Sequence, residues 1–386
     1  MNKNNYILGI DASNIRGGGG ITHLIELLKI DNIDIYGFKK VILWGGEKTL
    51  SLVEDRKWLI KINHNFLNKS LPFRLIWQLF LLSKNVRKYN CDILFIPGGT
   101  YWGIFRPFVT LSQNLLPFEF DELKRYGFSW MCLKMLLLRY SQSNTFKKAS
   151  GVIFLTNYAE TVVTKISGKL KNSTVISHGI PKRFKQSNSL VKNEIKEFKI
   201  LYVSIIDVYK HQINVVKAIN NLRKSGYSVT IDLIGPAYKP ELNRLLKVIS
   251  LIDPNNTFIR YIGHYPYNEL HKTYITYDIF VYASTCENQP IILLEAMASG
   301  LPIACSNFGP MPEVLEDAGL YFNPEDVCSI TIAIKDYLDN LQLRKINSIK
   351  SLNLSSNYSW ENCSQKTFEY LNKIISDNYS YKKSHE

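Results

Sequence analysis

Two glutamates, Glu287 and Glu295, stand eight residues apart in a stretch that could bind an anionic, hydroxyl-rich ligand. Glu287 falls in a loop after an expected strand, Asp278–Tyr282, and Glu295 falls just over one turn into the following helix. This arrangement places a carboxylate and several free backbone N–H groups at the carboxyl end of a parallel strand. Doubly wound sheets bind their ligands at that edge. The alternative for Glu295 is an ordinary acidic residue, which is stabilised near a helix N-terminus.

A lysine, Lys210, lies between another expected strand, Lys199–Ser204, and the helix after it. A cation at that position is well placed to meet a phosphate group. The alternative is a solvated lysine in a turn.

Two further segments follow strands in the N-terminal half. Arg16 precedes four glycines (Gly17, Gly18, Gly19 and Gly20), which follow the first strand and open the first helix. Glycines let the backbone approach a ligand closely, and a helix N-terminus favours an anion. Gln113 and Asn114 follow the strand Phe108–Leu111 and would face the same ligand. The alternatives are a flexible glycine turn and an ordinary strand-end loop.

Short apolar runs alternate with longer helical patterns along the whole chain, which indicates strands buried on both faces and hence parallel sheets. Two such series predict an α/β protein with two Rossmann-like, doubly wound domains. We expect an N-terminal domain at 1–180, a linker at 181–198, a C-terminal domain at 199–358 and a last helix at 359–378. The segment Glu122–Lys148 is expected to form one helix.

Composition narrows the class of protein. The chain has 386 residues, 46% of them hydrophobic, which suits two domains and excludes a disordered chain. No run approaches the roughly 18 apolar residues of a membrane-spanning helix, and the N-terminus is a poor signal peptide. Six scattered cysteines without a CxxC pair predict free thiols in a reducing cytoplasm.

Charge is distributed unevenly. The net charge of +14 divides into +16 for residues 1–200 and −2 for the remainder. This asymmetry predicts that the N-terminal half faces nucleic acid, a lipid surface or a phosphorylated substrate. The alternative is a lysine-rich surface that serves solubility.

Taken together, these motifs resemble those of a retaining glycosyltransferase of family 4, which has the GT-B fold, and of the subset that builds bacterial O-antigen or capsule. The resemblance covers nearly the whole chain. Its most specific part is the pair of glutamates with EAMASGLPI after Glu287. Support comes from the glycine loop and from five shorter stretches: FLTNYA (154–159), HGI (178–180), YKHQ (209–212), YIGHYP (261–266) and YSW (358–360).

The resemblance implies two domains around a central cleft and a role for each site residue. Glu295 would hold the ribose of a nucleotide-diphosphate sugar, Glu287 would touch its sugar, and Lys210 would neutralise the departing diphosphate. The glycine loop would close over the diphosphate or the acceptor. Further nucleotide-sugar contacts would come from Asn288, Gln289, Pro290, Ile291, Gly263 and His264.

Two positions depart from the family pattern. Many relatives carry an arginine where this chain has Ile205, so either Lys210 would act alone or His211 or Arg16 would compensate. Many also carry a histidine where Gln113 stands, and glutamine cannot exchange a proton near neutral pH. No DxD triplet occurs, so no cofactor or metal is expected, and Lys210 with backbone amides would stabilise the leaving group.

The implied acceptor is a saccharide on a polyprenyl diphosphate at the inner face of the cytoplasmic membrane. Residues 61–90 (net +6) and 131–150 (net +4) could lie on anionic lipid. Four apolar anchors are candidates there, with core packing as the alternative: Trp77, Phe80, Trp130 and Leu136–Leu138. Other functions that remain open are a GT-B nucleotide-sugar epimerase, a catalytically silent partner and a nucleic-acid-binding protein.

Overall fold

The chain forms two compact α/β units in a computed structural model, which describes residues 5–186 and 191–383 and side chains through residue 379. The N-terminal unit holds the residues up to Phe118, Ser129–Gly179 and the chain from Trp360 onward. The C-terminal unit holds Glu119–Phe128 and Ile180–Ser359. The expected linker 181–198 contains the 3₁₀ turn η5 (Lys182–Phe184) and the start of a strand, and its positions 187–190 lie outside the described residues.

The N-terminal unit is built on a seven-stranded parallel sheet in the order β3-β2-β1-β4-β5-β6-β7. Its central strands are apolar and buried on both faces, as the continuous apolar runs predict. The strands are β1 (Tyr6–Asp11), β2 (Phe38–Gly45), β3 (Leu59–Asn63), β4 (Ile93–Ile96), β5 (Phe108–Leu111), β6 (Gly151–Phe154) and β7 (Ser173–Val175).

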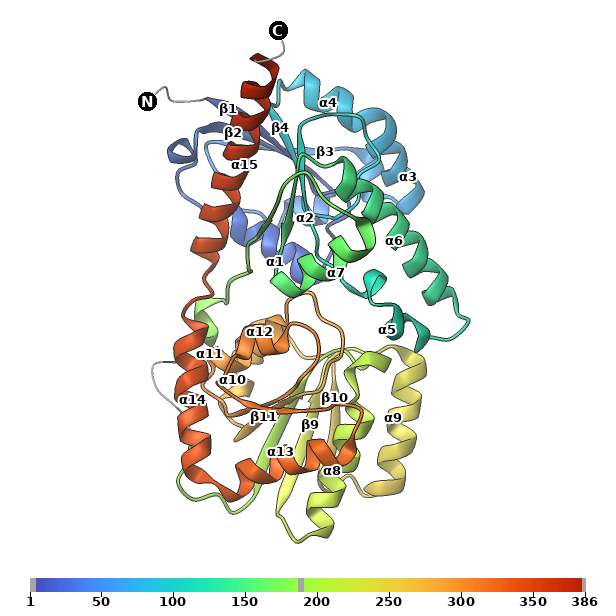
Figure 1. Ribbon diagram of the computed structural model, residues 1–386, viewed down its shortest axis with the longest axis vertical. Helices are drawn as coiled ribbons and strands as arrows, with labels where there is room; N and C mark the ends of the chain where they lie inside the picture. The colour runs from blue at the N-terminus through green and yellow to red at the C-terminus, as the bar shows by residue number, and fades with distance from the viewer. Residues whose placement is uncertain (1–4, 187–190, 384–386) are drawn as a thin grey trace. The chain divides into compact units, whose positions relative to one another are not determined.

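Helices cover this sheet. The last helix, α15, which is drawn in red in Figure 1, packs against α1 and β4 of the same unit. The elements are α1 (Gly18–Leu27), η1 (Asp34–Tyr36), α2 (Glu47–Leu50), η2 (Asn65–Asn68), α3 (Leu71–Ile76), the π-helical η3 (Trp77–Leu82), α4 (Ser83–Lys88), η4 (Leu116–Phe118), α6 (Trp130–Lys148), α7 (Asn157–Ser167) and α15 (Trp360–Lys383).

The C-terminal unit is built on a six-stranded parallel sheet in the order β10-β9-β8-β11-β12-β13. The pairs Val203↔Ile234 and Tyr282↔Cys305 align the carboxyl ends of neighbouring strands. The strands are β8 (Phe198–Val203), β9 (Val229–Ile234), β10 (Ile259–Gly263), β11 (Ile279–Tyr282), β12 (Ile303–Ser306) and β13 (Leu320–Phe322).

Most of its helices connect these strands, and α13 packs along α8 (Figure 1). They are α5 (Phe120–Lys124), η6 (Val208–Lys210), α8 (Gln212–Lys224), α9 (Lys239–Ile252), α10 (Tyr267–Tyr274), α11 (Ile291–Ala298), α12 (Met311–Leu315), α13 (Val327–Asp339) and α14 (Leu341–Ser355). The prediction of two doubly wound, Rossmann-like parallel-sheet domains is confirmed.

The prediction of a single helix at Glu122–Lys148 is wrong, because the structure has two helices there. Gly127 has a φ of +59°, which favours glycine and ends regular helix. The Ser129 hydroxyl then accepts a hydrogen bond from the Cys132 N–H (3.3 Å) and caps a new helix, α6. As a result α5 and the residues through Phe128 belong to the C-terminal unit, whereas the sequence placed them in the N-terminal domain.

Two buried imidazoles stack in the N-terminal unit. The His23 and His178 rings lie 4.8 Å apart, and the Trp360 ring lies 5.2 Å from His178. Burial lowers the pKa of His23 to about 4, and burial together with His23 lowers that of His178. Both rings are therefore neutral in the folded protein near pH 7.

These histidines predict a loss of stability in acid. Below pH 6.5, His23 becomes protonated in the unfolded chain but stays neutral in the folded protein. The free energy of unfolding therefore falls as the pH drops toward 4. At pH 5.5 the loss from His23 is about 1 kcal/mol. We expect His23→Phe to flatten the dependence of Tm on pH between 7 and 5, whereas His264→Phe, at an exposed position, leaves it unchanged. Equal slopes for all three proteins would contradict the assignment.

Candidate functional site

Lys210 is positioned by a single 3₁₀ turn at the carboxyl end of β8. The Asp207 carboxylate accepts a hydrogen bond from the Val208 N–H (2.8 Å) and caps η6. His211 then adopts a left-handed φ of 49° and starts α8. The turn leaves the Lys210 side chain only 5% exposed, so its ammonium needs partners inside the protein.

Glu287 and Tyr282 supply those partners from the neighbouring strand. Tyr282 is the last residue of β11, and Glu287 lies in the loop between β11 and α11. The Lys210 Nζ forms an ion pair with Glu287 Oε1 and lies 3.3 Å from the Tyr282 hydroxyl. That hydroxyl donates to Glu287 Oε1 at 2.5 Å. Burial and the charge of Glu287 raise the pKa of Tyr282, which therefore stays a neutral donor.

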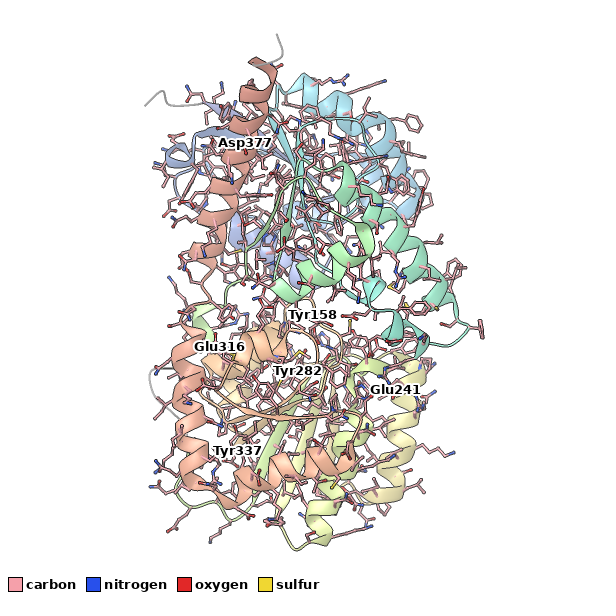
Figure 2. All side chains as sticks on the ribbon, in the orientation of Figure 1. Tyr158, Glu241, Tyr282, Glu316, Tyr337 and Asp377 are labelled. Atoms are coloured by element: carbon pink, nitrogen blue, oxygen red, sulfur yellow. The ribbon has the colours of Figure 1, made fainter. Side chains whose placement is uncertain are left out.

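Direct contacts hold these two loops together. The Tyr202 hydroxyl donates to the carbonyl oxygen of Lys210 and accepts from the Ala283 N–H (3.2 Å). The Thr285 N–H donates to the Tyr209 carbonyl at 2.9 Å. Tyr282, labelled in Figure 2, lies within the C-terminal unit among these groups. The pairing of β11 with β8 therefore brings Lys210 and Glu287 together.

Glu295 lies in the second turn of α11 and is fully buried. Its two oxygens accept hydrogen bonds from the hydroxyls of Tyr267 (2.8 Å) and Tyr274 (3.3 Å), both from α10. Burial raises the pKa of Glu295 to about 7, against the opposing effect of both hydroxyls and of Arg183. This residue is a buried acid that titrates near neutral pH, so it is unlike an ordinary acidic residue at a helix start.

The remaining predicted nucleotide-sugar residues lie on two carboxyl-edge loops. Asn288 and Gln289 are buried, and Pro290 precedes the first turn of α11. The Ile291 N–H already donates to the Gln289 carbonyl (2.9 Å). Gly263 ends β10 and accepts from the Gly235 N–H (2.8 Å), and His264 beyond it is exposed.

His211 does not supply the positive charge that Ile205 lacks. Its Nε2 lies 3.2 Å from the Thr285 hydroxyl, and burial together with Arg125 lowers its pKa to about 4. The imidazole is therefore neutral near pH 7. Lys210 is the buried cation at this edge, and Ile205 is partly exposed.

A segment that the sequence did not connect to the site packs on the turn that carries Lys210. The Tyr126 hydroxyl donates to Asp207 Oδ1 at 2.9 Å, and its ring packs against Tyr238. Arg125 anchors the same segment through ion pairs with Glu122 and Glu325. Burial raises the pKa of Asp207, while the hydrogen bonds from Val208 and Tyr126 oppose this rise. Tyr126 thus helps to hold the cap of η6.

The glycine loop of the N-terminal unit is shaped by two of its four glycines. Gly18 has a φ of +60°, and a Cβ on Gly20 would come within 2.8 Å of the Gln113 Oε1. Gln113 therefore packs directly on the start of α1. Asn114 beside it accepts from the Leu116 N–H (3.2 Å) and shapes its own loop. These predicted residues meet at one sheet edge, and Gly19 lies within the first turn of α1.

A buried carboxylate at the end of β1 is a second feature that the sequence did not reveal. Asp11 accepts hydrogen bonds from the Ser13 N–H (3.2 Å) and hydroxyl (3.0 Å), and also from Trp77 Nε1 (3.3 Å) and Gln78 Nε2 (2.8 Å). Burial raises the pKa of Asp11. This cluster fixes the loop that leads into Arg16. Trp77 is fully buried here, so the prediction of Trp77 as a membrane anchor is wrong.

No group of three or more His, Cys, Asp or Glu side chains within residues 5–186 and 191–383 is arranged to hold a metal ion.

Comparison with known proteins finds a sequence family that matches part of the C-terminal unit. Residues 183–350 match the sequence family Glycosyl transferases group 1. The chain is 39% identical over 110 residues to O-antigen chain mannosyltransferase B of Escherichia coli, covering 28% of this chain and 29% of that protein. It is 25% identical over 263 residues to Protein CapJ of Staphylococcus aureus, covering 67% and 65%. The chain therefore matches less than two thirds of the length of either relative.

One solved structure extends the similarity to both units. Anabaena Alr3699/HepE in complex with UDP and glucose superposes with a TM-score of 0.68 at 18% identity, covering 95% of this chain and 98% of that one. At this identity the likeness concerns the fold alone. The family match lies within the C-terminal unit, whereas the shared fold, of the GT-B type, extends to both units.

Proposed function

We propose that this protein transfers a hexose or deoxyhexose from a nucleotide-diphosphate sugar to a saccharide on a polyprenyl diphosphate, with retention of configuration, as a family 4 enzyme. The product would enter O-antigen, lipopolysaccharide or capsule synthesis. One observation carries the proposal: a buried Lys210 ammonium held by Glu287 and Tyr282 at the carboxyl edge of the sheet that matches the family. The similarity to an O-antigen mannosyltransferase, and the likeness in fold to a protein in complex with UDP and glucose, support this substrate class.

Lys210 would neutralise the leaving diphosphate. Cleavage of a sugar–phosphate bond develops negative charge on the diphosphate, which a pre-positioned cation stabilises more strongly than it does the intact donor. For this, the Lys210 ammonium has to share or exchange its contact with Glu287. Glu287 would then accept hydrogen bonds from donor-sugar hydroxyls, and Glu295 would accept them from the ribose. In this proposal no metal takes part.

The proposed chemistry balances without a protein nucleophile. The bond from the anomeric carbon to the phosphate oxygen breaks, and the acceptor oxygen bonds to the same face of that carbon. The acceptor hydroxyl proton passes to the leaving phosphate oxygen. The loop Asn288–Ile291 and the loop at Gly263 and His264 would position the diphosphate and the base.

The N-terminal unit would bind the acceptor through the glycine loop, Arg16, Gln113 and Asn114. Gln113 is held on the first turn of α1, so it can orient a sugar hydroxyl but cannot take its proton. This division leaves proton transfer to the donor phosphate.

We also propose that the N-terminal unit lies on the inner face of the cytoplasmic membrane. One face of α6 exposes apolar side chains, including Trp130 (74%) and Leu137 (59%), with Lys134, Lys147 and Lys148 exposed on the same helix. Phe80 in η3 is also exposed, near Lys84 and Arg87 in sequence. Apolar anchors among cations are typical of interfacial binding. No helix in the described part of the chain is long and apolar enough to span a bilayer.

The first prediction concerns Lys210 and Tyr126 and tests the activity itself. With a panel of nucleotide sugars and a polyprenyl-diphosphate saccharide, Lys210→Ala should reduce kcat at least a hundredfold, because it removes the charge opposite the leaving group. Lys217→Ala, at an exposed position of α8, should leave kcat unchanged. Tyr126→Phe should reduce kcat about tenfold alone and not at all in the Lys210→Ala background.

Near-normal turnover of Lys210→Ala, in a protein with unchanged Tm, would remove Lys210 from the mechanism. Fully additive losses in the double variant would show that Tyr126 does not act through the turn that carries Lys210. Tyr140→Phe, an exposed tyrosine on α6, is the matched control for the loss of a hydroxyl.

The second prediction uses the pKa of Glu295, about 7. The carboxylate accepts ribose hydroxyls better than the neutral acid does, so nucleoside diphosphate affinity should rise about tenfold from pH 6 to pH 8. In Glu295→Gln this rise should disappear. Calorimetric titrations with a 2′,3′-dideoxynucleoside diphosphate correct for protonation of the ligand. Its phosphates titrate like those of the nucleoside diphosphate, but it lacks the ribose hydroxyls. An equal rise in both proteins would exclude Glu295 as the ribose acceptor.

The third prediction concerns the α6 face. Leu137→Glu should reduce cosedimentation with anionic phospholipid vesicles severalfold, because it places a negative charge in an apolar contact surface. Ile332→Glu, similarly exposed on α13 of the C-terminal unit, should not. If both variants bind vesicles like the wild type, α6 is not the membrane-facing helix.

A further inference from the structure

Two arginines near the glycine loop carry charges that no carboxylate pairs with in the described part of the chain. Arg16 Nη2 donates to the carbonyl oxygens of Leu67 (2.7 Å) and Lys69 (2.6 Å). Arg74 Nη1, from α3, donates to the Ser13 carbonyl (3.3 Å) and to Asn14 Oδ1 (3.0 Å). All four acceptors are neutral oxygens.

Each guanidinium therefore uses one of its three nitrogens. A guanidinium has five N–H donors, and Arg16 Nε and Nη1 make no hydrogen bond to the described protein. Arg74 Nη2 likewise makes none, and its Nε is buried without a partner. The two side chains are fixed by the loop carbonyls while most of their donors remain unused.

The electrostatics of this pair favour an anion. Partial burial lowers the pKa of Arg74, and the nearby charge of Arg16 lowers it further. Asp11 acts in the opposite sense, but it is buried and accepts hydrogen bonds from Ser13, Trp77 and Gln78. Two like charges held together with partial desolvation are costly, and a bound anion removes that cost.

The surroundings indicate what carries the anion. Leu71, Phe73 and Ile76 of α3 are exposed on the same helix as Arg74. The Lys69 ammonium lies 4.8 Å from the centre of the Phe73 ring and adds a third cation at the rim. Planar guanidinium forks match phosphate oxygens in pairs, whereas exposed apolar side chains suit a hydrocarbon chain.

We propose that Arg16 and Arg74 form a binding subsite for the phosphate or diphosphate group of an amphiphilic acceptor. This inference rests on the proposed function for the identity of the acceptor, but the anion subsite itself does not. The sequence did not identify Arg74 as a ligand-binding residue. The proposal also assigns Arg16 a specific role, the binding of the acceptor phosphate.

A binding experiment tests the subsite directly. Inorganic pyrophosphate is titrated calorimetrically into the full-length protein, with saturating nucleoside diphosphate present to occupy a donor site. Arg74→Gln and Arg16→Gln should each weaken binding at least tenfold. Arg56→Gln is the matched control, because Arg56 in the same unit is paired with Asp31 and Glu54. Equal pyrophosphate affinity in all four proteins overturns the proposal.

The same series of variants includes controls for loss of folding. Should Arg74→Gln lower the Tm, Arg16→Gln decides the outcome, because the Arg16 side chain is exposed. Arg74→Lys keeps the charge but loses the fork, and it should fall between the wild type and Arg74→Gln. A lysine variant as weak as the glutamine variant still supports the guanidinium geometry, whereas wild-type binding by Arg16→Gln overturns it.

Kinetics identify the source of the phosphate. We expect Arg74→Gln to raise the acceptor KM at least tenfold, with the donor KM and vesicle binding unchanged. A raised donor KM would assign the subsite to the donor diphosphate, and lost vesicle binding with an unchanged acceptor KM would assign it to a phospholipid headgroup. Either result overturns the acceptor assignment. Pyrophosphate binding that depends on both arginines, in a protein without transfer activity, would refute the proposed function and keep the anion subsite.

Discussion

The buried ammonium of Lys210 is the constraint on which the C-terminal site depends. A charge that is 5% exposed needs a partner within reach, and that partner comes from a loop 77 residues away in sequence. Strand β11 pairs directly with β8, so their carboxyl-end loops meet and bring Glu287 to Lys210. Tyr202 then ties the two loops by one hydroxyl, while Asp207 and Tyr126 hold the turn from the other side. Parallel topology and electrostatics thus require the same arrangement.

The N-terminal unit treats charge at its sheet edge in the opposite way. Asp11 ends β1 fully buried, yet its partners are a serine, a tryptophan and a glutamine in place of a cation. The nearby guanidiniums of Arg16 and Arg74 are held by carbonyl oxygens and keep their charge uncompensated. One unit therefore has an internally neutralised cation and the other has cations prepared for an outside anion. That contrast agrees with the uneven charge of the sequence, +16 in residues 1–200 and −2 in the rest.

The sequence predicted those features that depend on local pattern and on parallel topology. Buried apolar runs identified most strands, and Lys210 and Glu287 meet because each follows such a run. The edge strand β3 has no such run, because Leu59–Asn63 is short and only partly buried. The break at Gly127 was missed because helical periodicity continues on both sides of it. Tyr126, Tyr267 and Arg74 had no local signal, because their roles arise from contacts with residues between 28 and 81 positions away.

The pairing of polar groups within this site also bears on its selectivity. Lys210 is bound to Glu287, and the Glu295 oxygens are bound to Tyr267 and Tyr274, so a ligand has to replace existing contacts and not merely fill space. A free phosphate can replace the contact that Lys210 loses, but it offers nothing to Glu295. A nucleoside can replace the contacts of Glu295, but it offers nothing to Lys210. Leaving a buried polar group without a partner costs about 1–3 kcal/mol. A molecule with both a diphosphate and a ribose compensates both exchanges, which is the physical reason why the proposed function assigns a nucleotide-diphosphate sugar to this edge and not either of its parts.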